Sequence, residues 1–199
     1  MSELVKEKKA LKSKDLIVAG AFAALYVVLM FVSVSVMGFV PILYICAPLL
    51  LPIILGPVYM FFVTKVPKRG AILILGILVG LLTSMGGVWQ AGVWALFISL
   101  IAELIASSGK YISKARYLLS YVVFACTNMG PFWMLLFAKS AFLEQCMLYY
   151  GADYAASLDA LTPDWLIIVL IAMALVGGLV GGLFGQRLIS KHFKKAGIV

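Results

Sequence analysis

The sequence predicts an all-helical integral membrane protein, a bundle of six transmembrane helices with both termini in the cytoplasm. The 199 residues are 64% hydrophobic, with a mean hydropathy of +1.12, which is more apolar side chain than a water-soluble core of this length buries. The basic residues behind the net charge of +8 stand in short clusters between long apolar runs. This pattern is typical of membrane topology signals and not of a nucleic-acid-binding face.

Six apolar runs have the length of a membrane span. A hydrocarbon core about 30 Å thick requires roughly 20 helical residues. Runs of this kind, bounded by charge, Pro or Gly, predict spans near residues 15–38, 41–64, 70–86, 88–108, 116–138 and 163–187. Together they form one transmembrane domain over 15–190, between a basic N-terminal segment 1–14 and a basic tail 191–199. Because the first run leads into more membrane, we expect it to stay in the mature protein.

The charges predict the orientation. Every basic residue except Lys139 falls in or beside the N-terminal segment, the second loop, the fourth loop or the tail, and the positive-inside rule makes this face cytoplasmic. An odd number of spans would place one basic terminus outside. The acidic residues of the opposite face fall in or beside the segment 139–163: Glu144, Asp153, Asp159 and Asp164.

Two helices carry faces of small residues. In the first span, Ala19 with Ala23 and Gly20 with Ala24 have a spacing of four, which places small side chains on one helix face and lets another backbone approach closely. Packing within the chain and docking against a separate membrane subunit both explain this face. For the second face we expect internal packing; it lies in the last span and consists of Gly177, Gly178, Gly181, Gly182 and Gly185.

The predicted outer end gathers polar and aromatic side chains, which we interpret as a ligand-binding site. An amide in the hydrocarbon region needs a partner, either a neighbouring helix or a ligand, whereas the aromatic rings also fit an interface belt. We expect the rings to stack on a flat, partly polar ligand while Gln90, Asn128 and Asp153 orient it. A cationic ligand is favoured over an anionic one. The candidate residues are Met85, Trp89, Gln90, Trp94, Asn128, Trp133, Tyr149, Tyr150 and Asp153.

The sequence contains few residues or motifs that indicate catalysis. His192 is the one histidine, and Cys46, Cys126 and Cys146 show no paired spacing, so neither a zinc site nor a disulfide framework is indicated. No Walker-type phosphate loop is present, so any ATPase must be another chain. We expect no enzymatic activity, no metal and no resident cofactor. Glu103, near the inner end of the fourth run, is either functional or paired with the cytoplasmic interface or Lys110.

The basic run Lys12-Ser13-Lys14-Asp15-Leu16-Ile17, followed by Ala19-Gly20-Ala21-Phe22-Ala23-Ala24-Leu25-Tyr26 and five further spans, resembles the substrate-binding S components of energy-coupling factor transporters. Within these it is most similar to the Trep_Strep group. The resemblance implies a six-helix bundle in the bacterial cytoplasmic membrane that holds its substrate near the outer surface. It further implies a transmembrane coupling subunit and two cytosolic ATPases as partners, and a toppling movement that delivers the ligand inward.

An Ala-x-x-x-Ala motif on the first helix contacts the coupling subunit in that family. The resemblance therefore implies this role for Ala19 and Ala23, with Gly20 and Ala24 broadening the face. We expect the cargo to be a vitamin or vitamin-like compound. No motif matches the S components that bind thiamine, riboflavin, biotin or folate, so the sequence leaves the identity of the compound open.

Two alternatives remain. Haem as the transported ligand has possible axial ligands at the outer end, although histidine, the commonest metal ligand, is missing there. The possible axial ligands are Met85, Met129, Met134, Met147, Tyr149 and Tyr150. A structural or assembly membrane protein without a ligand would use its small-residue faces only to hold partners.

Overall fold

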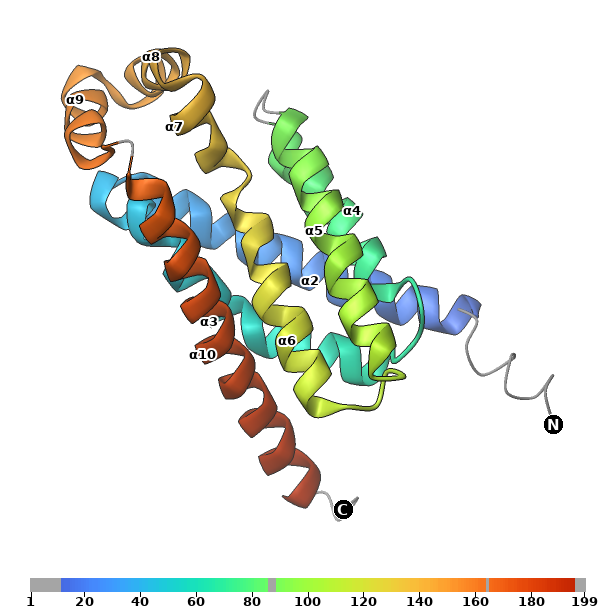
Figure 1. Ribbon diagram of the computed structural model, residues 1–199. Coiled ribbons are helices and arrows are strands. Elements are labelled where there is room, and N and C mark those ends of the chain that lie inside the picture. Colours follow the sequence, from blue (N-terminus) through green and yellow to red (C-terminus); the bar gives the residue numbers. More distant parts are fainter. Residues whose placement is uncertain (1–11, 86–88, 164, 196–199) are drawn as a thin grey trace, which may run out of the picture.

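The computed structural model describes residues 12–85, 89–163 and 165–195, which form helices joined by short connections, without a strand. The all-helical prediction is confirmed. Figure 1 shows the arrangement of the elements. In chain order these are α2 (Ser13–Gly38), α3 (Pro41–Lys65), α4 (Ala71–Ser84), α5 (Trp89–Ser108), α6 (Lys114–Phe124), the 3-10 turns η1 (Ala125–Met129) and η2 (Pro131–Trp133), α7 (Met134–Phe137), α8 (Lys139–Tyr150), α9 (Ala152–Leu161) and α10 (Leu166–Lys195).

Four of the described helices, α2, α3, α5 and α10, are long and apolar enough to cross a membrane. The third predicted span corresponds to α4, which is apolar but has only 14 residues. The fifth is not one helix, because it changes to 3-10 turns after Phe124 and resumes at Met134. Pro131, which lacks a backbone N–H, lies within this interruption. The six-span count stays a prediction for these two segments.

A close contact between α3 and α10 forms the centre of the bundle. Gly177, Gly181 and Gly185 of α10 face the backbone of α3, and a Cβ added at Gly181 would overlap the carbonyl of Pro52. The other two glycines of α10, Gly178 and Gly182, face α6 and η1. Absent side chains therefore let three elements approach closely, and the predicted internal packing of this face is confirmed.

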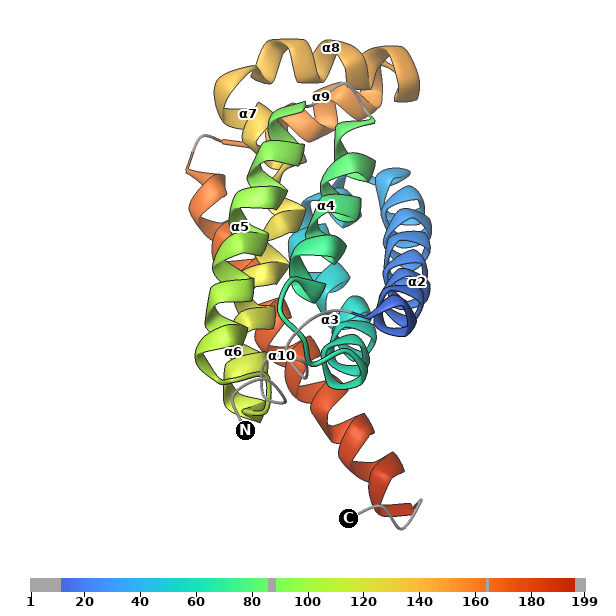
Figure 2. The same ribbon diagram turned by 90° about the vertical axis from the view of Figure 1, so that its right-hand side faces the viewer.

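The basic connections lie at one end of the bundle (Figure 2). Lys68, between α3 and α4, forms a 2.5 Å ion pair with Asp15 at the start of α2. The side-chain amide of Gln186 near the end of α10 donates to the carbonyl of Lys114 at the start of α6, at 2.6 Å. The short helices α8 and α9 lie across the opposite end. The predicted segregation of charge is thus present, and which end faces the cytoplasm stays a prediction.

Candidate ligand-binding site

A cavity of about 450 Å³ lies in the half of the bundle nearest α8 and α9. The second half of α2, the first turns of α3, the end of α4 and the turns η1 and η2 surround it. Most of the lining is apolar. The residues are Met30, Phe31, Val34, Tyr44, Ala47, Leu51, Leu82, Thr83, Met85, Asn128, Pro131 and Phe132.

Three polar side chains face this cavity: Asn128, Thr83 and Tyr44. Asn128 is 6% exposed, and its amide nitrogen donates to the carbonyl of Ala125 at 3.1 Å, while no described residue donates to its Oδ1. The Thr83 hydroxyl lies 3.0 Å from the carbonyl of Val79 in its own helix. No described residue hydrogen-bonds the Tyr44 hydroxyl. The amide oxygen of Asn128 is not among the fully buried polar atoms without a partner, so it is accessible from the cavity and can accept a hydrogen bond from a ligand.

Tyr44 lies at the junction with a second, smaller pocket of about 170 Å³ beneath α8 and α9. Its ring stacks on Phe132 with centroids 4.9 Å apart. On the far side the Tyr154 hydroxyl donates to the carbonyl of Gly38 at 2.8 Å, and its ring stacks on Tyr150. The two short helices are thus anchored to the end of α2. The lining consists of Gly38, Tyr44, Phe142, Gln145, Cys146, Tyr149, Tyr150, Tyr154 and Leu158.

The smaller pocket is uncharged at neutral pH. Burial raises the pKa of Tyr154 to about 12, with a further contribution from Cys146 and Tyr150 beside it. Burial likewise raises the pKa of the Cys146 thiol. Both groups therefore keep their protons at physiological pH.

The family model described as "Hypothetical bacterial integral membrane protein (Trep_Strep)" matches residues 13–195. The chain belongs to this family. No curated protein and no solved structure shows significant similarity to it. The match establishes a bacterial integral membrane protein, in agreement with the apolar helices.

The Trep_Strep protein brings four of the predicted site residues to its cavities. Met85 and Asn128 line the larger cavity, and Tyr149 and Tyr150 line the smaller pocket. The amide at membrane depth was the signal that located Asn128. Both cavities lie at the end of the bundle where the site is expected, and ligand binding there stays a prediction.

The other five predicted residues lie elsewhere. Trp89, 66% exposed, and Gln90 occupy the first, exposed turn of α5, and Asp153 is exposed in the first turn of α9. Trp94 and Trp133 pack against each other with centroids 4.9 Å apart, and the Trp94 indole N–H donates to the carbonyl of Cys126 at 2.7 Å. These two rings join α5 to η2 and line neither cavity, and the stacking of a ligand between tryptophans stays a prediction.

The sequence-based prediction missed the walls that α2 and α3 contribute. Met30, Phe31, Val34, Ala47 and Leu51 are apolar residues in long apolar runs. Nothing in their type separates a residue that lines a cavity from one that faces lipid. Only a polar residue such as Tyr44 could have drawn attention to this stretch.

The small-residue face of α2 divides in two. Ala19 and Ala23 are fully buried within the chain, so the packing explanation holds for this pair and their expected availability to a partner is corrected. A Cβ added at Gly20 meets nothing within 4 Å, and Ala24 is exposed. Contact of Gly20 and Ala24 with a partner stays a prediction.

Glu103 caps the start of α4. One carboxylate oxygen accepts the N–H of Gly70 at 2.8 Å and the Tyr111 hydroxyl at 2.6 Å; the other accepts the N–H groups of Ile72 and Leu73 at 3.1 and 3.3 Å. Gly70, with φ of 90°, has no side chain with which to cap its own helix. A carboxylate from α5 therefore satisfies N–H groups left open at this helix start. Pairing with Lys110, the expected alternative, does not occur among the described residues.

The possible haem ligands do not converge. Met85 lines the larger cavity, Met129 is fully buried in the core, and Met147 is exposed on α8. Met134 begins α7, and Tyr149 and Tyr150 line the smaller pocket. The described residues contain no group of three His, Cys, Asp or Glu side chains that could hold a metal ion.

Proposed function

We propose that this Trep_Strep protein is the substrate-binding S component of an energy-coupling factor importer. It captures a scarce small molecule, a vitamin or vitamin-like compound, at the outer face of the bacterial cytoplasmic membrane for ATP-driven uptake. The observation that supports this best is the cavity around Asn128, which lies away from the basic end of the bundle. If the basic end is cytoplasmic, the cavity is where an importer meets its cargo.

Six spans fit this proposal. The 14 residues of α4 cover roughly 21 Å, less than the hydrocarbon thickness. The cap from Glu103 supports such a short span, because it satisfies backbone N–H groups at the helix start inside the protein. The segment from Lys114 to Phe137 supplies the fifth span despite its 3-10 turns.

The exposed half of the small-residue face supports docking to the coupling subunit. Gly20 and Ala24 leave a shallow strip on the lipid side of α2, where another helix can approach closely. Cytosolic ATPases bound to that subunit then power uptake, since this chain has no phosphate loop.

The docking role is tested by copurification. The chain carries an affinity tag and is coexpressed with the coupling subunit and ATPases of its own bacterium. We expect the double variant Gly20→Leu with Ala24→Leu to lose at least tenfold of the copurified coupling subunit, because the added side chains fill the strip. Ala172→Leu, an exposed alanine on α10, is the matched control and keeps it. Equal recovery with both variants contradicts docking through α2; no recovery with wild type favours an assembly protein of another kind.

Haem remains a second candidate cargo on one observation: Met30 and Met85 line the same cavity, and thioethers serve as axial ligands of haem iron. Titration of the purified protein with haem decides this. A shifted, saturable Soret band that Met85→Leu alters supports haem, and a spectrum identical to free haem rules it out.

A further inference from the structure

The larger cavity lies away from the charges of the described chain. None of its lining residues is charged at neutral pH. Asp15 is paired with Lys68 and Lys139 with Asp159, while Glu103 is engaged by backbone N–H groups near the basic end. A charged group in this cavity would be desolvated without a counter-ion, which is strongly unfavourable. The cavity therefore selects against ions of either sign.

The polar part of the lining is small. It consists of the Asn128 amide, the Thr83 hydroxyl, which is engaged with its own helix, and the Tyr44 hydroxyl. Asn128 Oδ1 and the Tyr44 hydroxyl both lack a partner among the described residues; the hydroxyl can donate or accept, whereas Oδ1 can only accept. A ligand that satisfies Oδ1 needs an N–H or O–H group beside an otherwise apolar body.

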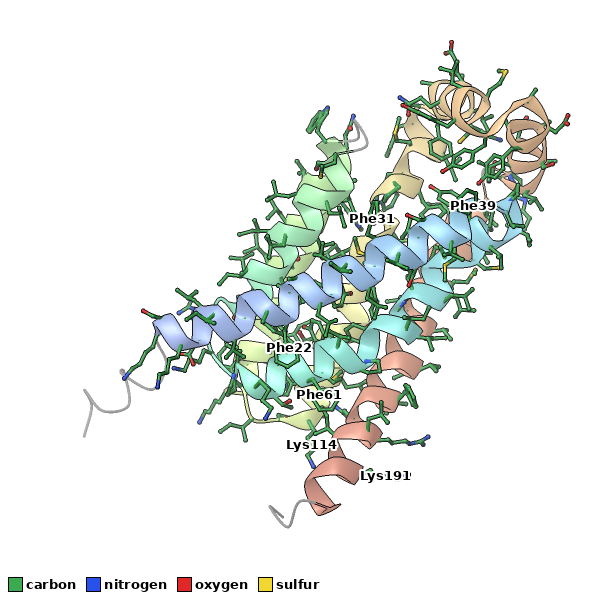
Figure 3. The ribbon with its side chains drawn as sticks, turned by 180° about the vertical axis from the view of Figure 1, so that it is seen from behind. Phe22, Phe31, Phe39, Phe61, Lys114 and Lys191 are labelled. Atoms are coloured by element: carbon green, nitrogen blue, oxygen red, sulfur yellow. The ribbon has the colours of Figure 1, made fainter. Side chains whose placement is uncertain are left out.

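The cavity opens between α2 and α4. Two lining residues, Phe31 on α2 and Met85 directly after the end of α4, are 59% and 83% exposed. In Figure 3, α2 crosses the near side of the bundle, and Phe31 is labelled beside the upper end of α4. Val28 and Val32 are exposed next to Phe31, so this flank of a membrane-spanning helix faces acyl chains. An apolar solute that first dissolves in the membrane reaches the opening from there.

We propose that the cavity takes an uncharged, mainly apolar ligand that donates one hydrogen bond to Asn128 and enters between α2 and α4 from the lipid. This inference rests on the proposed function and narrows its cargo. It replaces the cationic preference expected from the acidic outer segment, since Glu144, Asp153 and Asp159 line neither cavity.

Two fluorescent probes with one ring skeleton test this class. N-phenyl-1-naphthylamine is neutral and has one N–H donor, whereas 8-anilinonaphthalene-1-sulfonate adds a negative charge. Each is titrated into the full chain in nanodiscs, with empty nanodiscs as background. We expect saturable binding of the neutral probe and at least tenfold weaker binding of the sulfonate. Asn128→Leu removes the acceptor at similar volume and weakens the neutral probe about tenfold.

Cavity-filling variants show where the probe binds. Val34→Trp fills the cavity from α2 and Ala47→Phe from α3, so that one serves if the other misfolds; both are expected to weaken the neutral probe more than tenfold. Ala172→Trp, outside the cavity, leaves it unchanged. Equal affinities for both probes, lost together in Val34→Trp, overturn the uncharged class and leave the proposed function standing. Binding that is absent, or that no filling variant affects, overturns the cavity as a site. Neutral-probe binding without any copurified coupling subunit overturns the importer and leaves the ligand class intact.

Discussion

At the scale of single residues, the polar side chains of Glu103 and Asn128 have different roles. Glu103 is 8% exposed and accepts four hydrogen bonds, three of them from the start of α4. Asn128 is as well buried, yet its amide oxygen has no donor among the described residues. The first group is satisfied within the protein and is structural, while the second is available to a ligand. Residue type alone does not distinguish them, because both are simply polar groups at membrane depth.

Removing the charge at Glu103 should destabilise the bundle. In Glu103→Gln an NH₂ group replaces one of the two carboxylate oxygens. This group cannot accept a hydrogen bond from the backbone N–H groups at the start of α4, so at least one bond is lost. We expect a loss of about 1–3 kcal/mol and a lower melting temperature in detergent, measured by intrinsic fluorescence. Glu144→Gln, exposed on α8, is the control and should not change it. Identical melting temperatures for the two variants would show that the cap contributes little.

At the scale of elements, α10 and α2 use small residues differently. The glycines of α10 bring its backbone against α3 on one side and against α6 and η1 on the other. In α2 only Ala19 and Ala23 are enclosed, whereas Gly20 has open space beside it. The same four-residue spacing therefore indicates a buried seam in one helix and a half-open face in the other. Spacing predicts a face but not which neighbour covers it.

A methyl group added to each helix makes this difference measurable. Gly181→Ala places a Cβ against the backbone of α3, where neither helix can yield without moving, and we expect a loss of about 1–3 kcal/mol from overpacking. Gly20→Ala meets nothing within 4 Å and should leave stability unchanged or raise it, because alanine has the higher helix propensity. Thermal unfolding of the two variants in the same detergent checks the order. A reversal of that order would contradict the close α3–α10 contact.

At the scale of the whole molecule, the bundle has a basic end and, opposite it, an end covered by α8 and α9, which we call the capped end. Lys68 and Gln186 make contacts that join loops and helix ends at the basic side. At the other side Lys139 reaches from α8 to the carbonyl of Thr162 at 2.8 Å and pairs with Asp159 at 2.7 Å. The lone basic residue of the capped end is thus engaged by α9 and the residue that follows it.

The orientation can be tested by labelling from outside intact cells. In a background whose native cysteines are replaced, Ser140→Cys on α8 should react with a membrane-impermeant maleimide. Lys191→Cys on α10 should react only after the membrane is permeabilised. Both positions are exposed in the structure, so access is decided by the side of the membrane. Labelling of Lys191→Cys in intact cells would invert the topology and place the larger cavity on the inner side.

Sequence patterns predicted the helices better than their interruptions. The second span was placed to within one residue, because Pro41 fits the first turn of a helix and Lys65 marks its charged end. The break after Phe124 was missed, since apolar composition dominates that run and conceals the effect of Pro131. Of the cavity lining, Asn128 could be predicted because its amide is unusual at that depth. Val34 and Ala47 were not found, because the packing of helices far apart in sequence creates the cavity.

Substitutions have different consequences in two parts of the protein: the close contact between α3 and α10, called the seam, and the less tightly packed flank of α2. At the seam almost any replacement of glycine displaces a backbone, so its composition is tightly restricted. Phe31 and Val34 on α2 border open space instead, and a larger or smaller side chain there reshapes the cavity while the frame stays intact. If the cavity holds the proposed ligand, substitutions on this single helix can change which ligand fits while the α3–α10 contact stays intact.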